Sequence, residues 1–275
     1  MNLAAGNGLP GIGRVGIWFN DPGNWWGDNG LLGYAGEHLA YTIVVVITAA
    51  LAAIPLGLVI GHTGRGATWV AGLANASRAV PTLGLLILLI VAVSPHIRID
   101  QGWGSAVPAG SVPYLVPVLF VLVLVAVPPL LTSTYAGVRS LDPAIHEAAA
   151  GTGMTPSQVV LKVELPCALP LIMSGLRSAT LQVIATLTVA AYAPLVGGLG
   201  RLIVDGQQDL GDLRYGYPAM VAAGISVAVL ALVVDLLLQA VQLKLVSPGI
   251  TSKEARHRGI LATHRSRVRS SRAAG

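Results

Sequence analysis

The chain has 275 residues, of which 54% are hydrophobic and 11% are charged, and its net charge is +5. Soluble domains carry about 25% charged residues, so this composition excludes an ordinary soluble enzyme or binding module. The alternative of a large soluble helical core is disfavoured by residues 114–131, which lack any charged or amide side chain, because a helix of a soluble protein carries a polar stripe. The sequence therefore predicts an all-α integral membrane protein.

Five membrane-spanning regions are predicted in chain order, because a bilayer core needs about 20 helical residues to cross it. The first is expected at 38–60. The second, 67–94, is long for one crossing and contains Pro81, which disfavours helix at the residue before it. We expect a short, more polar half-helix and then an apolar helix over 82–93, with a sixth span left open. The remaining spans are expected at 113–135, 174–195 and 218–245.

The distribution of basic residues predicts the orientation. With the N-terminus outside, twelve of the 17 Lys and Arg residues fall on the inner side, as the positive-inside rule requires. We therefore expect an N-out/C-in topology. The expected parts are an extracytoplasmic or interfacial segment 1–36, a transmembrane domain 37–246 with a cytoplasmic loop 137–173, and a basic tail 247–275.

Both terminal segments have a distinctive composition. Trp18, Trp25 and Trp26 precede the first span and are expected to anchor in the headgroup layer, the alternative being a docking surface for a partner. Beside membrane spans, a basic tail is expected to face anionic lipid rather than nucleic acid. The basic tail residues are Lys253, Arg256, Arg258, Arg265, Arg267, Arg269 and Arg272.

The cytoplasmic loop is expected to contain two short helices. Asp142 is a good N-cap, and Pro143 follows at the first helical position, where its missing N–H costs nothing. Gly153 lies just beyond the expected end of this helix. Thr155 is a second N-cap, with Gln158 placed to complete a capping box. The second helix is expected to stop where the sequence reads Leu165-Pro166.

The first of these helices presents a run of alanines, 148–150, beside Glu147. Small side chains leave a smooth surface that a groove on another protein can approach closely, and the glutamate offers one charge to a partner's donor. From these features alone, a docking element and an amphipathic helix resting on the membrane are equally good interpretations.

The loop resembles the EAA motif of bacterial ABC importer permeases. Glu147-Ala148-Ala149 is followed after three residues by Gly153 and after nine more by Val163-Glu164-Leu165-Pro166. The family pattern is E-A-A-x3-G-x9-I-x-L-P, and the departure is valine for isoleucine. In that family the loop is the coupling helix, which seats in a cleft of the ATP-binding subunit. The resemblance assigns ATPase coupling to Glu147, Ala148, Ala149, Gly153, Leu165 and Pro166.

Residues 37–245 are also similar to permeases for glycine betaine, carnitine and choline. The segments that carry this likeness include 54–57, 79–83, 172–177 and 196–200. Importers of methionine and other amino acids share the type I five-span core, so an amino-acid permease is the alternative.

The resemblance implies a set of partners. An extracytoplasmic binding protein is expected to deliver the solute, separate ATPase subunits to drive transport, and a second permease chain, identical or paralogous, to complete the pathway. The sequence contains no Gly-x-x-x-x-Gly-Lys-Ser/Thr phosphate loop, so no enzyme activity is expected, and neither is a cofactor or a metal. An ion-coupled secondary transporter is less favoured, because it predicts inverted repeats and paired interior carboxylates.

Several residues are candidates for the transport pathway or a gate. Ionisable groups inside a membrane are costly and usually face protein or water, so Arg78 beside the Pro81 break and Asp235 in the last span could line a pathway or form structural pairs. Asp235 is expected to pair with a basic group near the inner face. Gly197, Gly198 and Gly200 permit a tight turn, which the family likeness associates with an outer gate or binding-protein contact; a plain flexible loop is the alternative.

Overall fold

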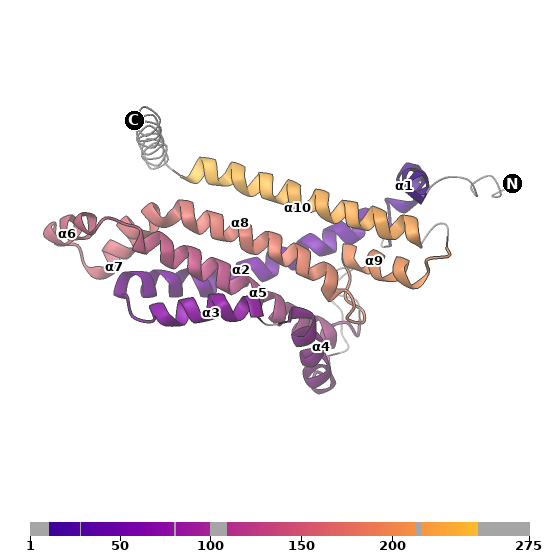
Figure 1. Ribbon diagram of the computed structural model, residues 1–275, viewed down its shortest axis with the longest axis horizontal. Coiled ribbons are helices and arrows are strands. Elements are labelled where there is room, and N and C mark those ends of the chain that lie inside the picture. Colours follow the sequence, from indigo (N-terminus) through magenta and orange to yellow (C-terminus); the bar gives the residue numbers. More distant parts are fainter. Residues whose placement is uncertain (1–10, 28, 80, 100–108, 213–215, 247–275) are drawn as a thin grey trace, which may run out of the picture.

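The computed structural model describes residues 11–27, 29–79, 81–99, 109–212 and 216–246 (Figure 1). Regular structure in these ranges is helical throughout, which confirms the all-α class. Four helical stretches in the described ranges are long and apolar enough to cross a membrane, and a shorter apolar stretch occupies Thr82–His96. The four are α2 (Leu31–Thr63), α5 (Val112–Arg139), Pro156–Ala190, which includes α8 (Leu165–Ala190), and α10 (Tyr217–Leu245).

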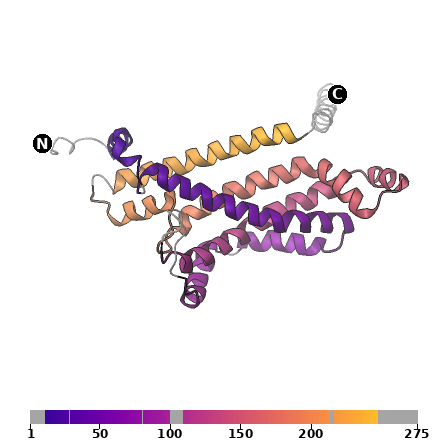
Figure 2. The same ribbon diagram turned by 180° about the vertical axis from the view of Figure 1, so that it is seen from behind.

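Helices α2, α5 and α8 run side by side and enclose the core (Figures 1 and 2). Their contact surfaces consist of fully buried aliphatic side chains, such as Val45, Leu122 and Val183. Because lipid tails are as apolar as these side chains, close packing rather than the hydrophobic effect holds membrane helices together. A Cβ on Gly57 or Gly61 of α2 would lie only 2.6 Å from a side-chain atom of α5. These glycines therefore set how closely the two helices approach.

The second apolar region is broken at Pro81, as predicted. Helix α3 (Ala67–Ala79) ends before it, and α4 (Thr82–Val93) begins after it with Pro81 as N-cap, followed by the 3-10 turn Ser94–His96. Helix α3 runs back along α5, whereas α4 turns away from the bundle axis (Figures 1 and 2). The break therefore redirects the chain within this region.

The second helix of the predicted loop does not stop at Pro166. Helix α6 (Pro143–Gly151) is separate, but α7 (Pro156–Val159) continues through a π-helical turn, Val160–Glu164, directly into α8. A proline ring clashes with the carbonyl four residues earlier in an α-helix. Here the preceding turn is π-helical, with the Leu165 N–H bonded to the Val160 carbonyl, so the helix passes Pro166 unbroken.

The end of the bundle opposite α6 contains α9 (Leu199–Gln208), which was not predicted, and α1 (Gly11–Asn20) with the 3-10 turn Pro22–Asn24 (Figure 1). Trp18 is buried in a cluster with Leu199 and Ala219, while Trp26 is 73% exposed. Trp18 is therefore packed inside the protein, whereas Trp26 faces outward. The predicted boundary at residue 37 falls inside α2, and the basic tail 247–275 lies outside the described residues.

Candidate functional site

The hairpin of α6 and α7 projects from one end of the bundle (Figure 1). The Asp142 carboxylate accepts a hydrogen bond from the Ala144 N–H at 3.0 Å, as an N-cap does. Gly153 has φ +78, the left-handed conformation that ends the helix. The Thr155 N–H donates to Gln158 Oε1 at 3.0 Å. The local predictions for both helix starts are therefore confirmed.

The first half of the motif is an exposed surface. Glu147, Ala148 and Ala150 are exposed, and only Ala149 is turned inward. Within the residues described, Glu147 makes no hydrogen bond or ion pair, and a Cβ on Gly153 would meet no atom within 4 Å. This surface presents one unpaired carboxylate and small side chains to solvent.

The second half of the motif anchors the hairpin to the spans. Leu165 packs against a buried cluster that includes Leu58 of α2, Val138 of α5 and Ile172 of α8. Pro166 is exposed and directly follows the π-helical turn. The two halves of the motif thus have different physical roles, one facing outward and one joining three helices.

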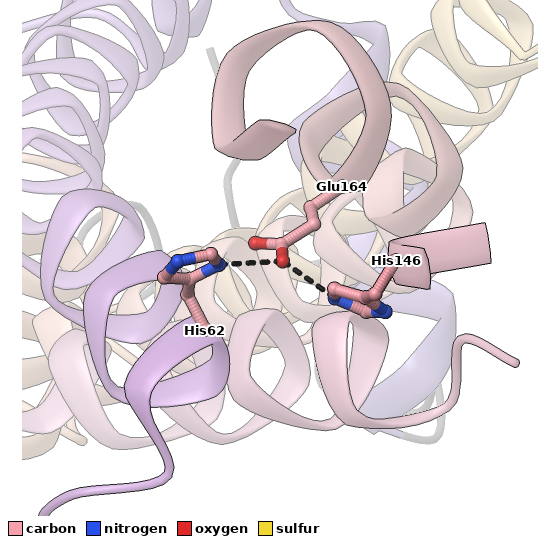
Figure 3. Close-up of side chains that lie close together, drawn as sticks. All are labelled: His62, His146 and Glu164. Carbon is pink, nitrogen blue, oxygen red and sulfur yellow. Dashed lines mark hydrogen bonds and ion pairs between the residues drawn. The ribbon is translucent and has the colours of Figure 1, made fainter. Parts of the chain in front are cut away.

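A cluster of three side chains, which was not predicted, joins α6 of the hairpin to the end of α2 and to the π-helical turn (Figure 3). His62 Nδ1, near the end of α2, and His146 Nε2, on α6, each lie 2.7 Å from Glu164 Oε1. The Glu164 side chain is fully buried, and its Oε2 has no hydrogen-bond partner. Sequence reasoning missed this cluster because the two histidines are 84 positions apart, and the family motif leaves the position of Glu164 unspecified.

At the opposite end of the bundle, the three candidate glycines form a closely packed turn. The Gly198 N–H donates to Glu37 Oε2 at 2.9 Å. Gly198 has φ +87, and a Cβ there would lie 3.2 Å from His38 Nδ1. A Cβ on Gly200 would lie 2.8 Å from Ala191 Cβ. These contacts favour an ordered turn held against α2 over a plain flexible loop.

The remaining pathway candidates lie apart from this turn. Asp235 of α10 accepts two hydrogen bonds from Arg177 of α8, both at 2.8 Å, so its predicted basic partner is confirmed. Pro81 is exposed at the start of α4. The side chain of Arg78 is not among those that the structure describes, so its role in the pathway stays a prediction.

A comparison with known families shows what kind of protein carries these features. Residues 53–247 match the family described as binding-protein-dependent transport system inner membrane component. The chain belongs to this family. The expectation of an ABC importer permease is confirmed, and the four long apolar helices agree with a multi-pass membrane protein.

The permease has several curated relatives. It is 33% identical to the choline transport system permease protein OpuBB of Bacillus subtilis, over 78% of this chain and 88% of the relative. It is 30% identical to the glycine betaine/carnitine/choline transport system permease protein OpuCB of the same organism, over 80% and 90%. It is 32% identical to the carnitine transport permease protein OpuCB of Listeria monocytogenes, over 83% and 93%.

A solved structure supports the fold. A chain of the inward-facing MetNI methionine ABC transporter matches with a TM-score of 0.62 and 22% identity, covering 79% of this permease and 96% of that chain. The helical arrangement is therefore the one expected for the type I importer core.

In the permease, the ion pair between Arg177 and Asp235 is expected to hold α10 against α8. Changing either residue to Ala leaves one charge without its partner in an apolar surrounding, which is costly. We expect each single variant to lower the melting temperature of the purified protein, and the double variant to lose less than the sum of the two. Additive losses in a double-mutant cycle would show that the two residues act independently.

Proposed function

We propose that this chain is the transmembrane subunit through which a small compatible solute, such as glycine betaine, carnitine, choline or a similar quaternary amine, enters a bacterial cell. The observation that carries the substrate class is the set of curated relatives, whose names specify choline, glycine betaine and carnitine transport at 30–33% identity over most of their length. The likeness to a methionine transporter is lower, at 22% identity, and supports the fold alone.

A separate ATPase subunit drives transport through the hairpin of α6 and α7. The exposed surface at Glu147, Ala148 and Ala150 suits close approach by a groove, and Gly153 leaves room beside it. Behind this surface the chain is helical from Pro156 to Ala190. A displacement of the hairpin therefore reaches α8 through one continuous helical segment, in which the π-helical turn and Pro170 are the points where the helix can bend.

The binding protein is proposed to contact the opposite end of the bundle. An extracytoplasmic binding protein delivers the solute on the side of α9 and the glycine turn at 197–200, and a second permease chain completes the pathway. This assignment uses the N-out/C-in orientation inferred from the basic residues. The ends of α2 and α10 nearest the C-terminus of each helix lie toward α6 (Figures 1 and 2). Arg65, which the orientation places inside, follows that end of α2, and Lys244, also placed inside, lies in the last turn of α10.

Uptake by the assembled transporter tests this proposal. The permease is co-expressed with its candidate ATPase and binding-protein partners in a strain that lacks its own osmoprotectant importers. We expect uptake of radiolabelled choline, carnitine or glycine betaine that stops on ATP depletion and persists when the proton gradient is collapsed. Uptake of methionine but of none of these amines would support the amino-acid alternative, and dependence on the ion gradient alone would contradict ATP-driven import.

A further inference from the structure

The Glu164 carboxylate is buried without a permanent cation beside it. Its side chain is fully buried, and in the part of the chain that the structure describes its ion-pair partners are the imidazoles of His62 and His146. Both contact the same oxygen, Oε1, and leave Oε2 buried and unpartnered. A buried carboxylate is costly unless it is paired or coordinates a metal. The site therefore contains no permanently charged cation among the described residues, and one carboxylate oxygen has no partner.

We infer that His62, His146 and Glu164 form a binding site for a divalent transition-metal ion of the zinc type. The three potential ligand atoms lie within 4.8 Å of one another, and they face a common point between α2, α6 and the π-helical turn (Figure 3). Two imidazoles and a carboxylate are a donor set that suits zinc. The same set does not suit Mg²⁺ or Ca²⁺, which prefer oxygen ligands.

The three ligand atoms can surround such an ion after the two imidazole rings move. Zinc binds nitrogen and oxygen ligands at about 2.0–2.2 Å, which separates ligand atoms in a tetrahedral site by roughly 3.3 Å. The two nitrogen-to-Oε1 distances are 2.7 Å and have to lengthen by about half an ångström. The two imidazole nitrogens, which lie within 4.8 Å of each other, have to come to a similar separation of roughly 3.3 Å. The side chains of His62 and His146 are 26% and 36% exposed. They can therefore move, and a water molecule can reach the fourth position.

The three proposed ligands come from three different elements of the chain. His62 is one residue from the end of α2, His146 is beside Glu147 on the hairpin, and Glu164 immediately precedes α8. An ion held by all three cross-links the hairpin to two spans. Zinc binding at this site does not depend on the proposed function. Its consequence rests on that function: the ion tightens the connection between the ATPase contact and α8.

Zinc titration of the full chain tests the site. The protein is purified in detergent with a histidine-free tag, treated with a chelator, and titrated with ZnCl2 by calorimetry in excess MgCl2. We expect one zinc ion per chain and a higher melting temperature with zinc, because an ion that binds the folded state stabilises it. We expect His62→Ala and His146→Ala each to weaken binding more than about 100-fold, since loss of a group that merely orients a ligand already costs about 10- to 100-fold.

His96→Ala is the matched control, because His96 is an exposed histidine in the 3-10 turn after α4. Its Nδ1–H donates a local hydrogen bond to the Ala92 carbonyl. It should bind zinc as the unaltered protein does. Normal gel-filtration profiles and cooperative thermal unfolding without zinc show that both ligand variants fold. Absence of saturable zinc binding by the unaltered protein, or zinc binding by both ligand variants as tight as that of the unaltered protein, would overturn the site. Neither result depends on ATPase, substrate or uptake, so the proposed function is tested separately.

Discussion

Gly153→Asp and Glu147→Lys are each expected to abolish ATP-dependent uptake while leaving the permease inserted in the membrane. Gly153 adopts φ +78 at the tip of the hairpin, where a residue with a Cβ is strained by about 1–2 kcal/mol, and the aspartate adds charge and bulk to the surface proposed to meet the ATPase. Glu147 is exposed and has no partner among the described residues, so reversing its charge alters that surface and not the fold.

Three measurements together test this expectation. Uptake should fall to the background of the strain, the ATPase should no longer co-purify with the variant, and the amount of permease in the membrane should be unchanged. Arg139→Glu is a charge-reversal control, because this exposed residue ends α5 outside the hairpin, and it should retain uptake. Normal uptake by both hairpin variants would rule out coupling through this surface.

Gly57→Leu and Gly61→Leu are expected to destabilise the bundle severely. A Cβ on Gly57 would lie 2.6 Å from Thr134 Cβ, and one on Gly61 would lie 2.6 Å from Val138 Cβ. The larger side chain must therefore push α2 away from α5. Overpacking of this kind costs about 1–3 kcal/mol at each site, occasionally more, and a marginally stable protein tolerates few such losses. The melting temperature of the purified protein and the yield of monodisperse material should both fall.

Gly224→Leu is the matched control for these two variants. Gly224 lies in the transmembrane helix α10, and a Cβ there would meet no atom within 4 Å. The substitution makes the same change in size and hydrophobicity without a clash, so the melting temperature should stay close to that of the unaltered protein. An equal loss in all three variants would show that helix propensity or insertion, and not the contact between α2 and α5, limits stability.

The features that sequence reasoning predicted well are encoded in neighbouring residues. The break at Pro81 follows from the missing N–H of one residue, and the cap at Asp142 from the reach of one carboxylate to an amide two residues away. The long apolar stretches follow from the thickness of the bilayer. The EAA motif was recognised for the same reason, since its residues stand at fixed spacing in a short segment.

One local prediction was wrong because a second local effect outweighed it. Pro166 was expected to end the second loop helix, since proline disfavours helix at the residue before it. The π-helical turn Val160–Glu164 changes the hydrogen-bond register just before Leu165 and Pro166. The helix that couples the hairpin to the spans is continuous as a result, and no residue of the hairpin signalled that turn in advance.

By itself, the sequence determined that the protein is a helical membrane protein with a capped hairpin resembling a coupling loop, because hydrophobic length and capping act over a few adjacent residues. Only the tertiary structure brought His62, His146 and Glu164 together, paired Arg177 with Asp235, and placed Gly198 against Glu37. These partners lie between 18 and 161 positions apart. Their contacts depend on how the helices pack against one another, and packing at that distance follows from the shape of whole surfaces.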